Sequence, residues 1–432
     1  MRLRVTLRGV CLRGISRMPK RPALVALLDI SLLVAAVLVA ATMVPAAASP
    51  LPTPAPAPGS RNLIAHGWCT SNMSVTTLPG LKLLWTGGMN CKSGPTASVD
   101  IYDPITTEVK PAGQLTKARY VHSALRLNDG RILIVGGEGP DRQPTRDVEI
   151  YDPSKLKSYP AGSIVTPRCL PSLTQLLDGE VLVTGRSLCR PYPVQVPVKS
   201  IELYNPRTGY SRIVGEFSVE RYDPDTTLLK DGRVLFTGGV DGDRKPVRQN
   251  EIYDPATATL TAAGAMTANR CRESIVSLPD GSVLFAGGAA CEIFPDDALK
   301  SAEIFDPLTN QFQAVGEMRS ARFCPGAALL KDGRVLLAAG AKGSYYTVSE
   351  NTAELYDPKS RSFTPTGKLT MGRSCPAAEL RSDGTVLIQG GFLQGSPMGK
   401  ASSLFNSEIY DPVRGEFTAV PQAGAPAIHS KN

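Results

Sequence analysis

The 432-residue sequence predicts an all-β fold, a seven-bladed β-propeller with four antiparallel strands in each blade. Three observations lead to this prediction. The chain is rich in Gly (40) and Pro (36), it repeats itself about every 50 residues, and it shows no helical apolar pattern of useful length after residue 49. A period near 50 with four short strands is typical of a propeller blade, which buries both faces only when blades stack around an axis.

The repeat is defined by an aromatic residue followed by Asp or Asn and then Pro, with an acidic residue two positions before the aromatic. The aromatic residues are Tyr102, Tyr151, Tyr204, Tyr253, Phe305, Tyr356 and Tyr410. The acidic residues are Asp100, Glu149, Glu202, Glu251, Glu303, Glu354 and Glu408. A turn followed by an apolar strand also occurs seven times, at Pro79-Gly80, Asp129-Gly130, Asp178-Gly179, Asp231-Gly232, Asp280-Gly281, Asp332-Gly333 and Asp383-Gly384. Both landmarks indicate seven units.

Within the second unit the expected strands, which we call a to d, are 120–127, 131–135, 148–151 and 158–161. Asp-Gly between strands a and b is a strong hairpin signal, and Asp-Pro between c and d favours a turn. A third landmark, Gly-x-apolar-x-x-x-Arg, occurs six times and connects successive units. Its arginines are Arg119, Arg168, Arg221, Arg270, Arg322 and Arg373.

The double glycine after strand b, as at Gly136-Gly137, and the later Glu-x-Tyr-Asp-Pro, as at 149–153, resemble the kelch repeat. The resemblance covers about 350 residues and implies a kelch-type propeller of the galactose oxidase central-domain-like superfamily, here of an exported bacterial type. Two units depart from the double glycine, with Gly185-Arg186 and Ala339-Gly340. The family includes adaptor domains, exported binding proteins and a few enzymes, so the fold does not specify a function.

The N-terminal region has the three parts of a secretory signal. Basic residues without an acid occupy 1–22, an apolar run extends over 23–44, and Ala46-x-Ala48 offers a cleavage site. We expect a signal peptide over 1–48, with an uncleaved anchor as the alternative, then a Pro-rich linker (49–61), the propeller (62–421) and a disordered tail (422–432). The expected location is secreted, periplasmic or at the cell surface.

The formal net charge of +8 first suggests a nucleic-acid or membrane partner. Residues 1–48 contain seven of the basic residues and one acid, which leaves 40 basic against 38 acidic residues. We therefore expect no nucleic-acid partner, and contact with a membrane only through the N-terminal segment if that segment is retained. We expect a monomer.

Eight cysteines follow the leader, an even number that fits an exported chain with disulfides. Three pairs bracket the a–b hairpins of units 1, 3 and 5, where the two ends of a hairpin are neighbours. These pairs are Cys69 with Cys91, Cys169 with Cys189, and Cys271 with Cys291. Cys324 and Cys375 both follow a connector arginine by two positions, which makes an inter-blade disulfide between them plausible.

Strand a is normally innermost in a kelch blade, so the connector arginines are expected around one mouth of the central channel, beside the b–c loops. The candidate ligand-binding residues are Arg119, His122, Arg168, Arg221, Asp223, Arg270, Glu273, Arg322 and Arg373. One interpretation is an anion-binding mouth. The alternative is that each arginine pairs internally with a strand-c acid, which the regular repetition favours. If variants of Arg270 and Arg322 lose ligand binding, the anion-binding mouth is supported. If they mainly lose stability, the internal pairing is supported.

The expected function is binding of a protein or carbohydrate ligand at this face. Mutarotase- or epimerase-like chemistry on a sugar is an alternative, because Glu273, Asp223 and His122 could supply an acid and a base. A purely structural surface protein is a third possibility. The copper site of galactose oxidase-like enzymes needs two histidines and two tyrosines, and His122 alone lies within a blade. We expect no catalytic residue, metal or cofactor.

Overall fold

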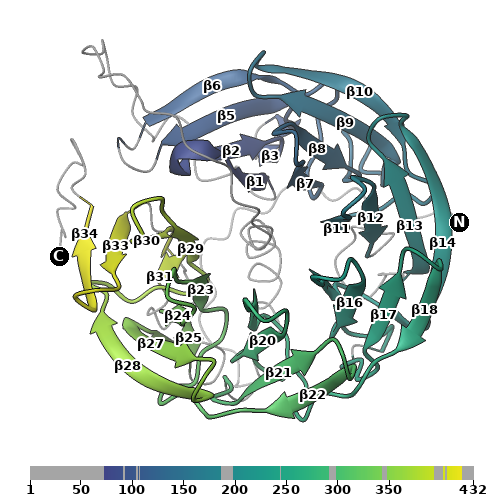
Figure 1. Ribbon diagram of the computed structural model, residues 1–432. Helices are drawn as coiled ribbons and strands as arrows, with labels where there is room; N and C mark the ends of the chain where they lie inside the picture. The colour runs from purple at the N-terminus through teal and green to yellow at the C-terminus, as the bar shows by residue number, and fades with distance from the viewer. Residues whose placement is uncertain are drawn as a thin grey trace, which may run out of the picture.

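The computed structural model describes residues 73–90, 93–103, 106, 108–185, 198–243, 245–290, 298–342, 348–393, 402–403 and 406–420. Over these residues the chain forms seven four-stranded antiparallel sheets arranged as blades around a central axis (Figure 1). The predicted seven-bladed propeller is therefore confirmed.

Each blade has its strands in the order a, b, c, d from the axis outward. The a strands are β1 (Ser74–Thr77), β7 (Ser123–Arg126), β11 (Ser172–Gln175), β15 (Asp225–Leu228), β19 (Ser274–Ser277), β23 (Gly326–Leu329) and β29 (Ala377–Leu380). The b strands are β2 (Leu83–Thr86), β8 (Ile132–Val135), β12 (Val181–Thr184), β16 (Val234–Thr237), β20 (Val283–Ala286), β24 (Val335–Ala338) and β30 (Val386–Gln389). The c strands are β5 (Ser98–Asp103), β9 (Asp147–Asp152), β13 (Val198–Asn205), β17 (Glu251–Asp254), β21 (Ala302–Asp306), β27 (Thr352–Asp357) and β33 (Ser407–Asp411). The d strands are β6 (Glu108–Gln114), β10 (Lys157–Ser163), β14 (Tyr210–Arg221), β18 (Thr259–Ala262), β22 (Gln311–Ala314), β28 (Ser362–Lys368) and β34 (Glu416–Ala419).

Short additional pairs extend the b–c loops of blades 1, 6 and 7. They are β3 (Met89–Asn90) with β4 (Gly94–Pro95), β25 (Ala341–Lys342) with β26 (Val348–Ser349), and β31 (Phe392–Leu393) with β32 (Ser402–Ser403). The a–b joint of blade 1 contains the 3-10 turn η2 (Pro79–Leu81), where the other blades have Asp-Gly. In blade 2, strand a is shorter than expected, because Tyr120 forms an isolated bridge with Glu138 before β7 begins.

Apolar side chains between neighbouring blades form the core. Six buried clusters each join residues of two successive blades, from blades 1 and 2 through to blades 6 and 7. The b strands supply both sides of these interfaces, since Ile132 and Ile134 pack toward blade 1 whereas Leu133 and Val135 pack toward blade 3. Strands buried on both faces explain why the b segments are continuous apolar runs rather than alternating ones.

Among the described residues, blade 1 begins with strand a and blade 7 ends with strand d, and neither sheet includes a strand from the other end of the chain. Among the described residues, no buried cluster joins blade 7 to blade 1. Leu83 and Trp85 of β2 are accordingly half-buried, whereas the corresponding Ile132 and Ile134 of β8 are fully buried. The predicted pairing segment 62–65 lies outside the described residues.

Within the part of the chain that the structure describes, we find no helix with the length and apolar character needed to cross a membrane. The apolar run 23–44, the linker 49–61 and the tail 422–432 lie outside the described residues.

Candidate binding site at the channel mouth

Each of the six connectors enters strand a through a non-glycine residue with positive φ, two positions after the connector arginine. We call these the mouth residues: Val121, Leu170, Asp223, Arg272, Cys324 and Cys375, with φ between 45° and 59°. Such values are uncommon outside glycine, so the surrounding structure must hold them in place.

Hydrogen bonds between mouth residues of successive blades help to hold this conformation. The N–H of Leu170 donates to the carbonyl of Val121 (2.8 Å), Cys324 N–H to Arg272 (2.9 Å), and Cys375 N–H to Cys324 (3.0 Å). The mouth residues therefore link neighbouring blades where strand a begins, around the axis seen in Figure 1.

The six connector arginines are not exposed at this mouth. Their exposed fractions are 0–1%, and each forms an ion pair with the strand-c glutamate of the blade that it enters. The pairs are Arg119–Glu149 (2.7 Å), Arg168–Glu202 (2.9 Å), Arg221–Glu251 (2.5 Å), Arg270–Glu303 (2.8 Å), Arg322–Glu354 (3.0 Å) and Arg373–Glu408 (2.9 Å). The structure thus contains the internal Arg–Glu pairs that the repetition favoured. These guanidinium groups are buried and do not line an anion-binding mouth, which corrects that interpretation.

Arg270 shows how such an arginine is held. Its Nε and Nη2 donate to Glu303, while Nη1 donates to the carbonyls of Gly287 and Ser301. Glu303 in turn accepts the backbone N–H of Thr267 (2.7 Å) in the connector. A buried charge pair is tolerable when its hydrogen-bonding groups are satisfied in this way. The network fixes the connector to strand c and thereby sets the position of the mouth residue.

His122 is also withdrawn from the surface. It is 2% exposed, and its Nε2 lies 2.9 Å from the Thr86 hydroxyl of blade 1. Burial and the charge of Arg119 lower the pKa of His122 to about 3, so the ring is neutral near pH 7. A Cβ added to Gly87 would lie 2.8 Å from the ring, which shows how tightly His122 is packed between blades 1 and 2. We assign it a structural position rather than a ligand contact.

The remaining candidates, Asp223 and Glu273, lie at the entries of blades 4 and 5, and the structure places Asp225 with them. Asp223 is exposed, Asp225 is half-buried as the first residue of β15, and Glu273 is 8% exposed. Neither carboxylate oxygen of Glu273 accepts a hydrogen bond from another residue. Arg272 lies over the Phe323 ring at 5.9 Å, and both side chains are half-buried.

Burial, the charge of Glu273 and the charge of Asp223 raise the pKa of Asp225, and Arg272 opposes them. Burial also raises the pKa of Glu273, opposed by its own backbone N–H and by Arg270. Two carboxyl groups that repel each other, one buried and one half-buried, are poorly suited to a stable scaffold, and perturbed groups of this kind gather at functional sites.

Asp225 is not among the candidate residues predicted from the sequence. A signal was available, because the equivalent strand-a residues of the other connected blades are small. They are Ser123, Ser172, Ser274, Gly326 and Ala377. Asp225 follows an Asp-Pro dipeptide that suggests a turn, whereas β15 begins at this residue.

The structure joins Cys324 and Cys375 in a disulfide that links the mouths of blades 6 and 7, as predicted. Cys169 and Cys271 are also disulfide-bonded. Their expected partners Cys189 and Cys291, and the whole Cys69–Cys91 pair, lie outside the described residues.

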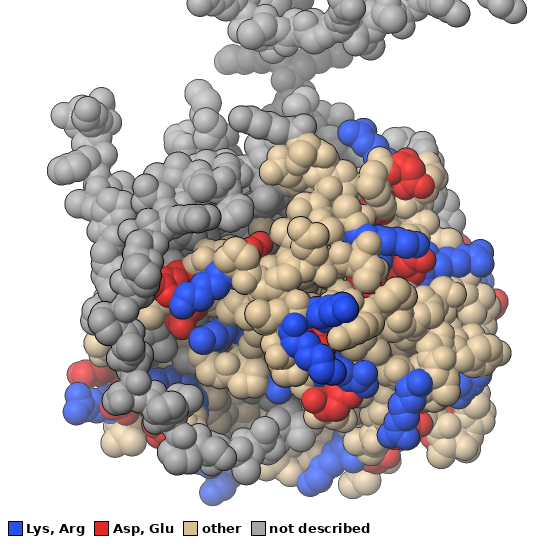
Figure 2. Space-filling view, turned by 90° about the horizontal axis from the view of Figure 1, so that it is seen from above, with Lys and Arg blue, Asp and Glu red and all other residues tan. Residues whose placement is uncertain are grey.

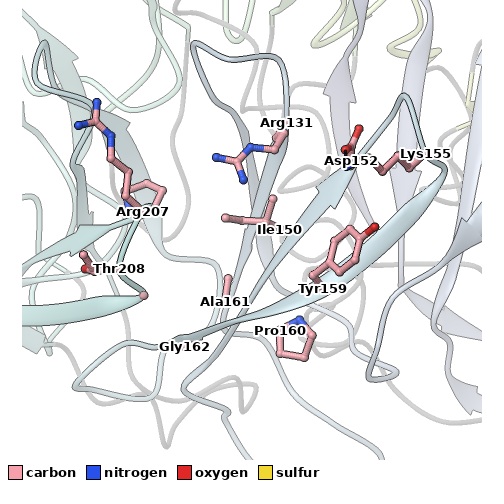
Figure 3. Close-up of a pocket in the computed structure, with 12 residues that line it drawn as sticks. Arg131, Ile150, Asp152, Lys155, Tyr159, Pro160, Ala161, Gly162, Arg207 and Thr208 are labelled. Atoms are coloured by element: carbon pink, nitrogen blue, oxygen red, sulfur yellow. Dashed lines mark ion pairs between the residues drawn. The ribbon is translucent and has the colours of Figure 1, made fainter.

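A separate cavity of about 430 Å³ lies between blades 2 and 3, toward the outer strands (Figure 3). Arg131 and Lys155 of blade 2 and Arg207 of blade 3 contribute to its lining, together with Tyr159. Arg131 is paired with a neighbouring Asp, as is Lys155, so much of the positive charge is neutralised. On the face presented in Figure 2, basic and acidic side chains are interspersed, without a broad surface of one sign.

Comparisons with known proteins support the fold. Over 62 residues, 14% of this chain and 18% of the relative, the chain is 39% identical to an F-box/kelch-repeat protein of Arabidopsis thaliana, so it matches less than a fifth of that protein's length. The fold is that of a kelch-like β-propeller. A fungal alcohol oxidase of the AA5 family, in complex with copper, is a structural neighbour with a TM-score of 0.60 and 19% identity, covering 78% of this chain and 75% of the oxidase. No family model matches the chain.

The described residues do not fit a copper site of two histidines and two tyrosines. His122 is the histidine among them, and it is packed between blades and engaged with Thr86. Among the described residues no group of three or more His, Cys, Asp or Glu side chains is arranged to hold a metal ion. His66 and His429 lie outside the described residues.

Proposed function

We propose that this chain is an exported kelch-like propeller that binds a protein or carbohydrate ligand at the face bearing the mouth residues and the b–c loops. The observation that carries the proposal is the chemical variety of the mouth residues on a constant scaffold. The same buried Arg–Glu pair recurs in six blades, whereas the mouth residues differ from blade to blade. Val121, Cys324 and Cys375 are buried, and the mouth residues that reach the surface are Leu170, Asp223 and Arg272. Variation on a constant framework is the usual arrangement of a recognition surface.

The charged and aromatic part of this face lies at blades 4 to 6. Asp223 is exposed, and the half-buried Arg272 and Phe323 contact each other across the boundary between blades 5 and 6. An aromatic ring beside ionic groups offers both apolar contact and directed hydrogen bonds, a combination common in protein and sugar recognition.

The test is a screen of the mature protein against glycan and protein arrays. The double variant D223A/R272A should lose at least tenfold in affinity for any ligand found, with its melting temperature little changed. Arg334→Ala removes an arginine that is part-exposed and paired with Asp332 near an a–b turn, and it should leave binding unchanged. If no ligand of any class binds, the purely structural alternative is preferred. Sequencing the N-terminus of the released protein tests export, with cleavage expected near Ala48.

A second candidate function is acid–base catalysis on a sugar, as in mutarotation or epimerisation. The observation that favours it is the Asp225–Glu273 pair, since two carboxyl groups with raised pKa values can share the roles of acid and base. NMR exchange spectroscopy of reducing sugars tests this directly. Faster anomer exchange that is lost in D225N would support catalysis, and unchanged exchange would exclude it for the sugars tried.

A further inference from the structure

We propose that Asp225 and Glu273 form a receptor for one basic group of the ligand, the ammonium of a lysine or the guanidinium of an arginine on a protein partner. This inference rests on the proposed function and names the chemistry that the mouth recognises.

The two carboxyl groups belong to the innermost parts of adjacent blades. Asp225 begins β15 of blade 4, and Glu273 immediately precedes β19 of blade 5. A Cβ added to Gly238 would lie 3.9 Å from Oδ2 of Asp225, and one added to Gly288 would lie 3.1 Å from the Cβ of Glu273. These glycines, which end the b segments of blades 4 and 5, leave room for the two side chains.

The boundary between blades 4 and 5 is also more open than its neighbours at this level. β15 and β19 approach each other less closely than β11 and β15 do, or β19 and β23. Inter-blade hydrogen bonds are present on both sides, from the Ser172 hydroxyl to the Pro224 carbonyl (3.2 Å) and from the Ser274 hydroxyl to the Pro325 carbonyl (2.8 Å). The carboxyl pair thus lies at a widened boundary.

The site has an excess of negative charge. Among the described residues, Asp225 is influenced by two other carboxyl groups, those of Asp223 and Glu273, and by the guanidinium of Arg272, while the Arg270 guanidinium near Glu273 is already bonded to Glu303. The carboxylate of Glu273 is more than nine-tenths buried, and neither of its oxygens accepts a hydrogen bond from another residue. A buried carboxylate in this state destabilises the fold, and a basic group that donates several N–H hydrogen bonds would relieve it.

The other blades show that the scaffold does not require these acids. At the position of Glu273 the connected blades have mostly proline: Pro171, Pro224, Pro325 and Pro376. A departure from the repeat that weakens the fold is expected where a function compensates for it. A metal ion is less suitable than an organic cation, because among the described residues no three His, Cys, Asp or Glu side chains, Asp223 included, are arranged to hold a metal ion.

The three carboxyl groups differ in how deeply they are buried, and a basic group would meet them in that order. Asp223 is exposed, Asp225 is half-buried and Glu273 is the deepest of the three. A lysine or arginine side chain combines a terminal cation with a long stem, which suits a carboxyl group that lies deeper than its neighbours. In the free protein the charge excess is relieved by protons on Asp225 and Glu273, so the basic group competes with protons for the site.

The experiment measures binding of capped Gly-Lys-Gly and Gly-Arg-Gly tripeptides by ligand-observed NMR and calorimetry at pH 7.5 and pH 5.0. Matched tripeptides with norleucine or glutamate in the centre are controls for the apolar stem and for charge. We expect the basic peptides to bind at least tenfold more tightly at pH 7.5 than at pH 5.0, with proton release visible as a dependence on the ionisation heat of the buffer. Equal binding of the norleucine peptide, or binding without proton release, would overturn the proposal.

Variants locate the effect. D225N and E273Q should each weaken the basic peptides at least tenfold, whereas Glu317→Gln, an exposed acid on the connector after blade 5, should change nothing. Both substitutions preserve side-chain volume, so the variants should fold. Melting curves will test this. Unaltered affinity in folded E273Q and D225N would refute the assignment.

Two further outcomes separate this inference from the proposed function. Butylamine binding as tightly as the lysine peptide would indicate a receptor for small amines and not for a protein partner. If the arrays identify a neutral or acidic ligand that needs Asp223 and Arg272 while the basic peptides do not bind, the proposed function holds and this inference fails. If nothing binds, both fail.

Discussion

Two kinds of buried charge occur within a few residues of each other in this propeller. Arg270 and Glu303 are 0–1% exposed, oppositely charged and satisfied by hydrogen bonds, and the same pair recurs at six blade entries. Asp225 and Glu273 are both acids, occur together once, and neither oxygen of Glu273 accepts a hydrogen bond from another residue. The repeated Arg–Glu pairs are needed for the blades to fold. The Asp225–Glu273 pair is not required by the repeat and is therefore available for a function.

Repetition is the reason that the first kind is structural. A pair present in every connected blade fixes a connector to strand c at each position around the ring, so its loss anywhere should be felt as loss of stability. A feature present at one boundary serves no such general purpose. The predictions below test this contrast, beginning with the largest expected effect.

Arg270→Ala should destabilise the protein by about 3–5 kcal/mol, because it leaves Glu303 charged, buried and without its main partner. Chemical denaturation of the purified protein measures this. Arg334→Ala is the matched control, since that part-exposed pair with Asp332 should contribute about 0–1 kcal/mol. Similar losses in the two variants would contradict the structural role of the buried pairs.

Removal of the Cys324–Cys375 disulfide in a C324A/C375A variant should cost about 2–4 kcal/mol, because the bond closes a long loop in the unfolded chain. The two cysteines are 51 residues apart and join the mouths of blades 6 and 7. Mass mapping without reductant should recover the linked peptides, and denaturation should show the lower stability. Recovery of a free Cys324 thiol would count against the disulfide.

The double variant D225N/E273Q should be more stable than the natural sequence at pH 7.5, by about 1–3 kcal/mol, because it removes two adjacent carboxyl groups whose ionisation costs free energy in the folded state. Both folded pKa values are raised, so the native state binds more protons than the unfolded state above about pH 4. Stability should therefore fall as pH rises through this window in the natural protein, and less so in the variant. Denaturation across pH 4–8 measures the slope, and an unchanged slope would contradict the assignment.

The propeller was predictable because its signals are local and occur seven times. Asp129-Gly130 and the apolar segment after it define the first hairpin of a blade, and the other units repeat this pattern. The internal pairing of the connector arginines was also favoured by their repetition beside a repeated strand-c acid. The left-handed conformation of the mouth residues was less accessible, since nothing in a β-branched side chain such as Val121 suggests it. The cavity beside Tyr159 depends on the spacing of two blades, which the sequence does not encode locally.

A single half-buried acid provides the most sensitive test of the contrast. Glu379 of β29 has one oxygen that is buried without a partner, and burial raises its pKa to about 7, opposed by the positive charge of Arg126. Since a nearby cation compensates it in part, Glu379→Gln should stabilise the protein at pH 7.5 by no more than about 1 kcal/mol. The ordinary pKa of a glutamate is near 4.3, so above this pH the folded protein binds the Glu379 proton more tightly than the unfolded chain does. The natural protein therefore loses stability as pH rises toward 7. The gain from the variant should be smaller at pH 5. Denaturation at both pH values tests this order, and a larger gain at pH 5 would show that the side chain acts through something other than its charge.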